Sequence, residues 1–410
     1  MEKLGNYILD IAAGPFGSNL KVECFVPKGF PIIDGANLKS YKVTDNITKF
    51  VTEEKARSLH RSIARKNDVV VTISGNVGQI SYIPYNSMYD EYLVSQRQFR
   101  VTFDTSRVYV PFLVYYFHTK EGQHKILSFA NQTGVPALAQ PLKNFRNIDI
   151  ELPDLKTQQK IAQILESIDN KIENNCQIND NLEQQAEALY KSWFVDFEPF
   201  KDGKFIESEL GQIPEGWRIY TLNELMDIKR GSSPRPIQSY LSETGLKWLK
   251  ISDATSCSSP FIYEIQEHIK SEGLRNTVYL QKGALVLSNS ATPGLPKILG
   301  IDTCIHDGWL YFPISKLSNP FMYLMFIKFR ENLISQANGS VFMNLKTEIV
   351  KNLKIALPKR EIIEQFDLII SSVFNEIRNR TEEMLNLSKQ RDTLLPKLMS
   401  GEIKINEIDC

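Results

Sequence analysis

An internal repeat constrains the fold of this chain more than any other feature of its sequence. Residues 134–153 (GVPALAQPLKNFRNIDIELP) align without a gap with residues 339–358 (GSVFMNLKTEIVKNLKIALP), so the two copies are 205 positions apart. Each copy ends in alternating apolar and polar residues followed by a proline, a pattern typical of a half-buried strand. This duplication predicts two similar modules in one chain.

Earlier segments repeat as well, with small gaps. Residues 68–74 match residues 283–289, and both are predicted to form buried strands that lead into a loop containing a glycine. Residues 109–112 match residues 318–321, and each segment opens an apolar stretch with helical character. Short strands mixed with a few helices in each module indicate the α+β fold class.

A long helix is predicted after each module. No proline or glycine interrupts residues 156–197 or 359–395. Apolar residues recur there at alternating spacings of three and four, which is the periodicity of a coiled coil. We expect the two helices to pack as an antiparallel coiled coil, which would give the chain an internal pseudo-twofold repeat. The predicted seam consists of Ile161, Leu165, Ile168, Ile172, Leu182, Leu189, Phe366, Ile370, Val373, Ile377, Leu387 and Leu394.

Polar residues interrupt this predicted seam. Asn175 and Asn179 lie in the first helix, and Arg380 and Arg391 lie in the second. Buried polar residues at such positions fix the register of paired helices at some cost in stability. The alternative is a pair of ordinary core helices in a bundle. A helix of about 40 residues spans on the order of 60 Å, which favours a spacer between two modules.

These patterns divide the chain into six parts. Pro396 and Gly401 are predicted to end the second helix, and glycines and prolines mark the connector between the halves. The predicted parts are the first module (1–153), the first long helix (154–197), a linker (198–215), the second module (216–358), the second long helix (359–400) and a tail (401–410).

The order of these parts resembles a known family. The most specific segments are residues 191–197 (KSWFVDF), the connector 211–217 (GQIPEGW) and the start of the first helix at 153–159. Together they are similar to the specificity subunits of type I restriction-modification systems, the HsdS family, over essentially the whole chain. The second helix departs slightly, because Glu364 and Gln365 stand where the first helix has Gln159 and Lys160.

The resemblance implies a function and a set of partners. Each module would be a target-recognition domain that reads one half of a bipartite double-stranded DNA sequence. The paired helices would space the modules and dock two methyltransferase (M) subunits, which bring S-adenosylmethionine. Restriction (R) subunits with helicase and nuclease activity would use ATP and magnesium. The chain itself would bind no cofactor or metal and would have no catalytic residues.

Two motifs suggest catalysis but lack the context that catalysis needs. Residues 319–322 (NPFM) resemble the NPPY loop of amino-methyltransferases without its second proline, and Asn319 as a helix cap before a proline explains them. Asp154 and Asp169 resemble nuclease carboxylates, but Asp169 is predicted to lie within a helix. No glycine-rich loop for S-adenosylmethionine follows a strand. The alternatives are a stand-alone DNA methyltransferase or nuclease, or a coiled-coil scaffold with protein- or sugar-binding modules.

Composition limits the remaining classes. With 48 basic and 48 acidic residues the net charge is zero, which argues against a protein that coats DNA by bulk charge. The five cysteines are far apart and show no metal-site or disulfide spacing. No apolar run approaches the roughly 18 residues of a membrane span, and the N-terminus lacks an apolar signal core, so we expect a cytoplasmic protein.

Candidate DNA contacts are basic and amide side chains near predicted loops. Arginine and glutamine are the side chains that pair bidentately with guanine and adenine in the major groove. Three arginines share one face of a predicted helix over 54–66, although a solvated surface is the simpler explanation. Polar residues at a strand edge are the simpler explanation for the next group, at 96–100. The candidates are Arg57, Arg61, Arg65, Gln96, Arg97, Gln98, Arg100, Lys229, Arg230, Arg235, Asn289, Lys297 and His306.

Overall fold

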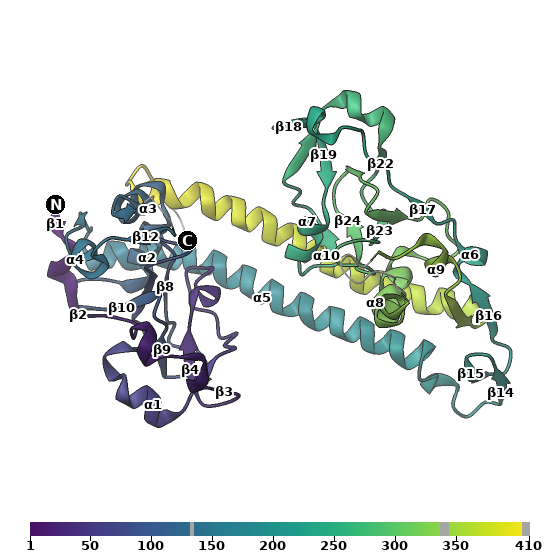
Figure 1. Cartoon of the computed structure of the whole chain (residues 1–410), viewed down its shortest axis with the longest axis horizontal. Helices are drawn as coiled ribbons and strands as arrows, with labels where there is room; N and C mark the ends of the chain where they lie inside the picture. The colour runs from purple at the N-terminus through teal and green to yellow at the C-terminus, as the bar shows by residue number, and fades with distance from the viewer. Residues whose placement is uncertain (132–134, 337–343, 404–410) are drawn as a thin grey trace. The chain divides into compact units, whose positions relative to one another are not determined.

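The computed structural model describes residues 1–131, 135–336 and 344–403 (Figure 1). The chain forms two compact units, one built from Met1–Lys171 with the segment from Asn386 onward, the other from Ile172–Leu385. Both long helices, α5 (Leu155–Phe194) and α10 (Arg360–Met399), contribute residues to each unit. Gly134, residues 339–343 of the repeat and Cys410 lie outside the described residues.

Unit 1 contains two main sheets. The first has the order β2-β10-β7-β8, all antiparallel, and its strands are β2 (Ile8–Ala13), β10 (Gln98–Phe103), β7 (Val69–Thr72) and β8 (Ile80–Tyr82). The second has the order β3-β5-β4-β9-β6, with strands β3 (Phe25–Val26), β5 (Phe50–Val51), β4 (Phe30–Ile33), β9 (Glu91–Val94) and β6 (Ile63–Arg65).

The β7 strand shows why this arrangement follows from the sequence. Successive side chains of a strand point to opposite faces, so a strand that is apolar at every position must be covered on both sides. Val69 and Val71 belong to the core beneath α2 (Val110–His118), whereas Val70 packs into a second core with Ile33 and Tyr92. The predicted buried strand at 68–74 is therefore confirmed.

Smaller elements complete unit 1. Helix α3 (Lys120–Leu127) follows α2, and a short strand pair joins β13 (Asp149–Ile150) to β1 (Glu2–Lys3). Ile148 and Ile150 are fully buried, as the alternation in the sequence predicts. The remaining elements are α1 (Glu53–Ser58), α4 (Pro141–Arg146), β11 (Ala130–Asn131) and β12 (Ala137–Leu138).

Unit 2 repeats the first sheet with the order β17-β26-β23-β24, to which β20 is added. Gly14 N–H donates to the Gln98 carbonyl at 2.8 Å, and Gly231 N–H donates to the Trp309 carbonyl at the same distance. Equivalent residues of the two units therefore make the same hydrogen bond. The sheet consists of β17 (Lys229–Arg230), β26 (Trp309–Tyr311), β23 (Leu285–Ser288), β24 (Pro296–Leu299) and β20 (Phe261–Ile262).

The second sheet of unit 2 has the order β18-β21-β19-β25-β22. Its strands are β18 (Leu241–Ser242), β21 (Glu267–Ile269), β19 (Leu246–Leu249), β25 (Thr303–Ile305) and β22 (Val278–Leu280). The helices of this unit are α6 (Leu222–Leu225), α7 (Ile251–Ser256), α8 (Asn319–Ser335) and α9 (Thr347–Lys351). Strand β27 (Lys354–Leu357) pairs with β16 (Arg218–Thr221), as β13 pairs with β1.

The long helices run antiparallel, because Tyr190 lies against Phe366 while Asn175 lies beside Glu383. The predicted seam is only partly correct. Ile161, Leu165, Phe366, Ile370 and Ile377 are buried. The other seam residues are half-buried. Further helix residues are buried where the helices pack into the module cores, namely Ala162, Tyr190, Phe194, Phe374, Leu395 and Leu398.

The predicted polar interruption of the helix pair is confirmed in unit 2. Asn175 donates to Glu383 at 2.7 Å and accepts from Arg380 at 3.0 Å. Asn179 donates to the Thr381 hydroxyl at 3.2 Å. Polar contacts of this kind form only when the partner side chains face each other, so they favour this register of the two helices.

Helix α5 ends earlier than predicted, and Pro396 does not end the second long helix as expected. Helix α5 ends at Phe194, and the linker that follows includes a hairpin of β14 (Phe205–Ser208) and β15 (Gly211–Pro214). Helix α10 continues through Pro396 to Met399. A proline so close to a helix end removes only one backbone hydrogen bond, which the packing of Leu395 and Leu398 offsets. Within the described residues no helix is both long and apolar enough to cross a membrane.

Candidate nucleic-acid interface

The three arginines predicted on one helix face lie in three different elements. Helix α1 ends at Ser58, Arg61 lies in a 3-10 turn, and Arg65 lies in β6. The predicted helix over 54–66 is therefore wrong. Ile63 pairs with Leu93 in the sheet and is buried there, so tertiary packing overrides the local helical spacing.

Two of these arginines join a surface ion-pair network. Arg57 contacts Glu91 at 2.6 Å and Glu53 at 2.8 Å, and Arg65 contacts Glu91 at 3.0 Å. Exposed pairs of this kind contribute little to stability and are easily exchanged for another anion. Arg61 is exposed and lines a hollow with Arg65, beside the loop that carries Gly14.

In the group at 96–100, Arg100 and Gln98 face the interior. Arg100 is 6% exposed, and its guanidinium contacts Asp10 at 2.6 Å and the Arg61 carbonyl at 2.9 Å. Gln98 is also buried and hydrogen-bonds to Ser95 and Thr72. These placements give both residues a structural role and do not favour the contacts to bases that the sequence suggested.

Gln96 and Arg97 are exposed in the turn between β9 and β10. They border a hollow of about 560 Å³ that is also lined by polar residues of neighbouring loops. Those residues are Asp34, Lys49, Asn76 and Gln79. Amide and guanidinium groups around a hollow can donate and accept hydrogen bonds at base edges. Because both side chains are exposed beside this hollow, they are available for such contacts.

In the second module, Lys297 and Asn289 also turn inward. Lys297 is 3% exposed and donates to the Cys257 carbonyl at 2.7 Å and to the Ser259 carbonyl. Burial lowers the pKa of this ammonium group. Asn289 is buried and donates to the main-chain carbonyl of Asp307 at 3.2 Å. Both side chains support loops from within, which does not favour direct contacts to DNA.

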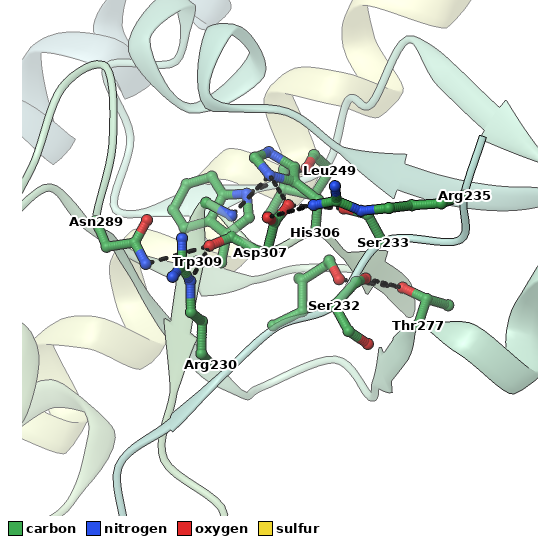
Figure 2. Close-up of polar contacts among 12 residues, drawn as sticks. Arg230, Ser232, Ser233, Arg235, Leu249, Thr277, Asn289, His306, Asp307 and Trp309 are labelled. Atoms are coloured by element: carbon green, nitrogen blue, oxygen red, sulfur yellow. Dashed lines mark hydrogen bonds and ion pairs between the residues drawn. The ribbon is translucent and has the colours of Figure 1, made fainter. Parts of the chain in front are cut away.

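The remaining candidates of the second module gather around the turn 306–308 (Figure 2). Arg230 donates to the Asp307 carbonyl at 2.5 Å, and Arg235 lies 3.4 Å from the Asp307 carboxylate. His306 accepts from the Gly308 N–H at 2.8 Å, and burial lowers the pKa of its imidazole, so the ring is neutral at pH 7. Lys229 is exposed on β17 beside Arg230.

Sequence reasoning missed Asp307, the residue at the centre of this group. Its carboxylate accepts from the Ser233 hydroxyl at 2.7 Å, which is the main reason why its pKa is lowered. A single aspartate in a turn has no motif, and its partners lie more than 70 positions earlier in the chain. In the sequence, only the hydrophobic segments on either side, which form β25 and β26, indicate that these residues lie in a loop.

The residues of the catalytic alternatives have structural roles. Asp154 accepts from the Thr157 N–H at 3.1 Å at the start of α5, and Asp169 contacts Arg391 at 2.8 Å. The cap of α8 is Ser318, which accepts from the Phe321 N–H at 3.1 Å; Asn319 was predicted wrongly, because it is the first helical residue.

Metal-ligating side chains do not gather in the described parts of the chain. Among these residues, no group of three or more His, Cys, Asp or Glu side chains could hold a metal ion. Cys24, Cys176, Cys257 and Cys304 are free thiols.

Comparison with known proteins agrees with the repeat. Residues 23–184 and residues 214–387 each match the family model for the "Type I restriction modification DNA specificity domain". The chain is 26% identical over 367 residues to the type I restriction enzyme MjaIX specificity subunit of Methanocaldococcus jannaschii, covering 87% of this chain and 82% of that protein. It is 25% identical over 394 residues to the HindI specificity subunit of Haemophilus influenzae, covering 80% and 84%.

A solved structure supports the fold. The crystal structure of a type I restriction-modification system S subunit from M. genitalium superimposes with a TM-score of 0.58 at 16% identity, over 97% of this chain and 95% of that one. At this identity the likeness concerns the fold alone, which agrees with the predicted α+β modules and paired helices. The two matches of the family model cover most of the sequence. The chain therefore belongs to the type I restriction modification DNA specificity domain family and contains two copies of that domain.

Proposed function

We propose that this chain is the non-catalytic specificity subunit of a type I restriction-modification complex. Each module reads one half of a bipartite double-stranded DNA target. One observation carries the proposal. The two modules share a sheet order and a turn that is followed by a hydrogen bond from a glycine, Gly14 or Gly231. That turn contains Gln96 and Arg97 in the first module but Asp307 and Gly308 in the second. A common backbone fold with different side chains at the equivalent turn suits two domains that bind different DNA sequences.

Catalysis in this proposal belongs to the partners. Two methyltransferase subunits dock on the chain and bring S-adenosylmethionine, and they flip an adenine out of the duplex because a stacked base cannot be reached. Restriction subunits supply the ATP- and magnesium-dependent steps. The relatives are named as specificity subunits of type I restriction enzymes, which supports a role in recognition for this chain. The proposed complex acts in the cytoplasm.

The alternative of a stand-alone enzyme finds little support in the side chains. A nuclease would need Asp154 and Asp169 free to bind a metal, but the first caps a helix and the second pairs with Arg391. A scaffold that binds protein or sugar would leave the match to a DNA specificity domain without an explanation. The proposed function accounts for both the family and the duplication.

Methyl transfer from labelled S-adenosylmethionine tests the proposal. The purified chain alone should transfer no methyl groups to DNA and should not cut it. The same chain produced with its methyltransferase partner should methylate adenines at a split sequence. Methylation by the isolated chain, free of partner, would contradict the non-catalytic role. A partnered complex without preference for any sequence would contradict the role in recognition.

Exchange of one module tests the division into two readers. Residues 1–153 are replaced by the corresponding module of a relative, and methylated adenines are mapped across the genome of cells that carry the complex. One half of the recognised sequence should change and the other should stay. A change in both halves, or in neither, is incompatible with two independent readers.

A further inference from the structure

The turn 306–308 of the second module is a centre of hydrogen bonds (Figure 2). Its main-chain carbonyl at Asp307 accepts from Arg230 at 2.5 Å and from Asn289 at 3.2 Å. The Asp307 carboxylate accepts from Ser233 at 2.7 Å and from Arg235 at 3.4 Å. The turn between β25 and β26 is thereby tied to the loop after β17.

That loop holds Arg235 on a stiff backbone. Ser232 donates to the Asn276 carbonyl at 3.1 Å, and Thr277 donates to the Ser232 carbonyl at 2.9 Å. Pro234 and Pro236 flank Arg235, and each proline ring fixes one backbone angle. The side chain of Arg235 is nevertheless 81% exposed. An exposed guanidinium group on a backbone that is already fixed loses little conformational entropy when it binds a ligand.

The surroundings of Arg235 form an open, mixed-charge hollow of about 950 Å³. Its lining includes Trp248, Lys250, Glu267 and His306 as well as the couple of Arg235 and Asp307. Lys250 is paired with Glu267, whereas Arg235 makes one long contact to Asp307 and keeps its other N–H donors available. The guanidinium is therefore the group best placed to donate to a ligand in this hollow.

A carboxylate beside an exposed arginine favours base edges over phosphate. The negative charge of Asp307 repels a phosphate but can accept from the amino group of cytosine. Arginine donates to the O6 and N7 acceptors of guanine. The lowered pKa of Asp307 keeps its carboxylate ionised at neutral pH. An arginine and an ionised aspartate side by side therefore complement the major-groove edge of a G·C base pair.

The corresponding place in the first module has different chemistry. By the shared hydrogen bonds of Gly14 and Gly231, Gln96 occupies the position of Asp307. The loop after β2 approaches Gln96, since a Cβ at Gly17 would lie 3.0 Å from its side-chain oxygen, but that loop exposes Phe16 rather than an arginine. The arginine–aspartate couple is thus a property of the second module.

We infer that Arg235 is a base-reading residue of the second module, that Asp307 positions it, and that the half-site read by this module contains a G·C base pair contacted by the two. The inference rests on the proposed function. Arg230 and Asn289 contribute by holding the turn from below through the Asp307 carbonyl.

Binding of matched DNA duplexes by the complex of this chain with its methyltransferase partner tests the inference. Each guanine of the second half-site is replaced in turn by 7-deazaguanine, which lacks the N7 acceptor, or its G·C pair by A·T. For the unsubstituted protein, replacement at one position should weaken binding by roughly 5- to 100-fold. Arg235→Ala should abolish this discrimination at that position, and Asp307→Asn should reduce it at the same position. Discrimination in the first half-site should be unchanged in both variants.

Arg275→Ala is the matched control, because it removes the same charge from an exposed position of the same module. It should leave discrimination at the sensitive base pair intact. Equal weakening of all duplexes by Arg235→Ala would identify a phosphate contact and overturn the inference, as would an absence of any effect. If the unsubstituted complex shows no bipartite preference, the proposed function itself fails. If the Asp307→Asn variant does not assemble, the Arg235→Ala variant still tests the inference, because the side chain of Arg235 is exposed and is not part of a hydrophobic core.

Discussion

The two modules hold the long helices by different chemistry at equivalent positions. In unit 1, Asp169 of α5 accepts from the Tyr115 hydroxyl and contacts Arg391 of α10 at 2.8 Å, and the Arg391 guanidinium lies over the Tyr41 ring at 5.1 Å. The repeat, with its offset of 205 positions, places Phe374 where unit 1 has Asp169, and Ala186 where it has Arg391.

In unit 2 this place is apolar. The ring of Phe374 packs against Tyr323 at 5.5 Å and Phe261 at 6.3 Å, and Ala186 is fully buried. Beside it the Tyr323 hydroxyl donates to Glu183 at 2.6 Å, and the Tyr263 hydroxyl donates to Glu382 of α10 at 2.9 Å. A partly buried ion pair gains little net stability over apolar packing but is sensitive to the loss of either partner. The duplicated fold therefore accepts either an ion pair or apolar packing at this position, provided that both contacting side chains are of the same kind.

The largest expected effect comes from shortening the helix pair between the two attachments. Residues 173–179 of α5 and 378–384 of α10 face each other, because Asn175 contacts Glu383 and Asn179 contacts Thr381. Removing both segments takes one heptad from each helix and shortens the pair by about 10.5 Å at roughly 1.5 Å per residue. If the pair sets the distance between half-sites, the spacer of the target should shrink by about three base pairs.

Mapping of methylated adenines in cells that carry the deletion measures this effect. Both half-site sequences should be retained, since Phe374, Asp169 and Arg391 stay in place. DNA twist opposes the change, because three base pairs turn the second half-site by roughly a third of the 10–10.5 base-pair repeat. Insertion of one heptad at the same point is the matched control and should lengthen the spacer. A folded, active deletion variant that still methylates the original spacing contradicts the role as a spacer.

Phe374→Ala should destabilise unit 2 by about 3–5 kcal/mol, because it leaves a cavity among buried aromatic rings. Hydrogen exchange of the whole chain, read separately for the amides of each unit, measures the effect, and unit 1 should be spared. Leu368→Ala, on the same helix but 76% exposed, is the control and should change stability by less than about 0.5 kcal/mol. An equal effect of both substitutions would mean that the apolar attachment contributes nothing.

Arg391→Ala should destabilise unit 1 by about 2–3 kcal/mol, because it leaves the carboxylate of Asp169 buried without its cation. The double variant Asp169→Asn/Arg391→Ala should lose less, since the amide oxygen still accepts from Tyr115 and no buried charge remains. Lys389→Ala is the control, because Lys389 is exposed on the same helix. Stability is measured by chemical denaturation, with hydrogen exchange of the unit 1 amides as the readout. A greater loss in the double variant would refute the electrostatic explanation.

The smallest effect concerns pH. The ring of His118 lies 4.3 Å from that of Tyr41, between ring centroids. Burial lowers the pKa of its imidazole below the usual value near 6.5, against the opposing hydrogen bond to the Ile80 carbonyl, and Arg391 acts in the same direction as burial. The folded state therefore favours the neutral ring, and unit 1 should lose stability as pH falls below about 6.5, by at most about 1.4 kcal/mol per pH unit. His118→Gln should flatten this dependence in thermal unfolding between pH 7 and 5, whereas an unchanged slope would assign it to other groups.

Local patterns predicted much of the fold correctly. The buried strands β7 and β23, the helices opened by Pro111 and Pro320, and the two 40-residue helices all follow from spacing along a few turns or strand residues. The helix over 54–66 failed because Ile63 is buried in a sheet with Leu93, a contact that no local pattern contains. The seam was partly wrong because side chains of the modules, as well as the partner helix, pack against the long helices.

The sequence by itself determined the duplication, the two long helices with their polar centre, and the resemblance to type I specificity subunits, because each of these depends on a periodicity, a repeated segment or a short motif. Only the tertiary structure decided which candidate side chains face solvent. Arg100 is buried and pairs with Asp10, 90 positions away, and Lys297 is buried and donates to a carbonyl 40 positions away. Arg235 is exposed and contacts Asp307, 72 positions away. Burial and charge pairing depend on such distant partners, and one-dimensional spacing carries no information about them.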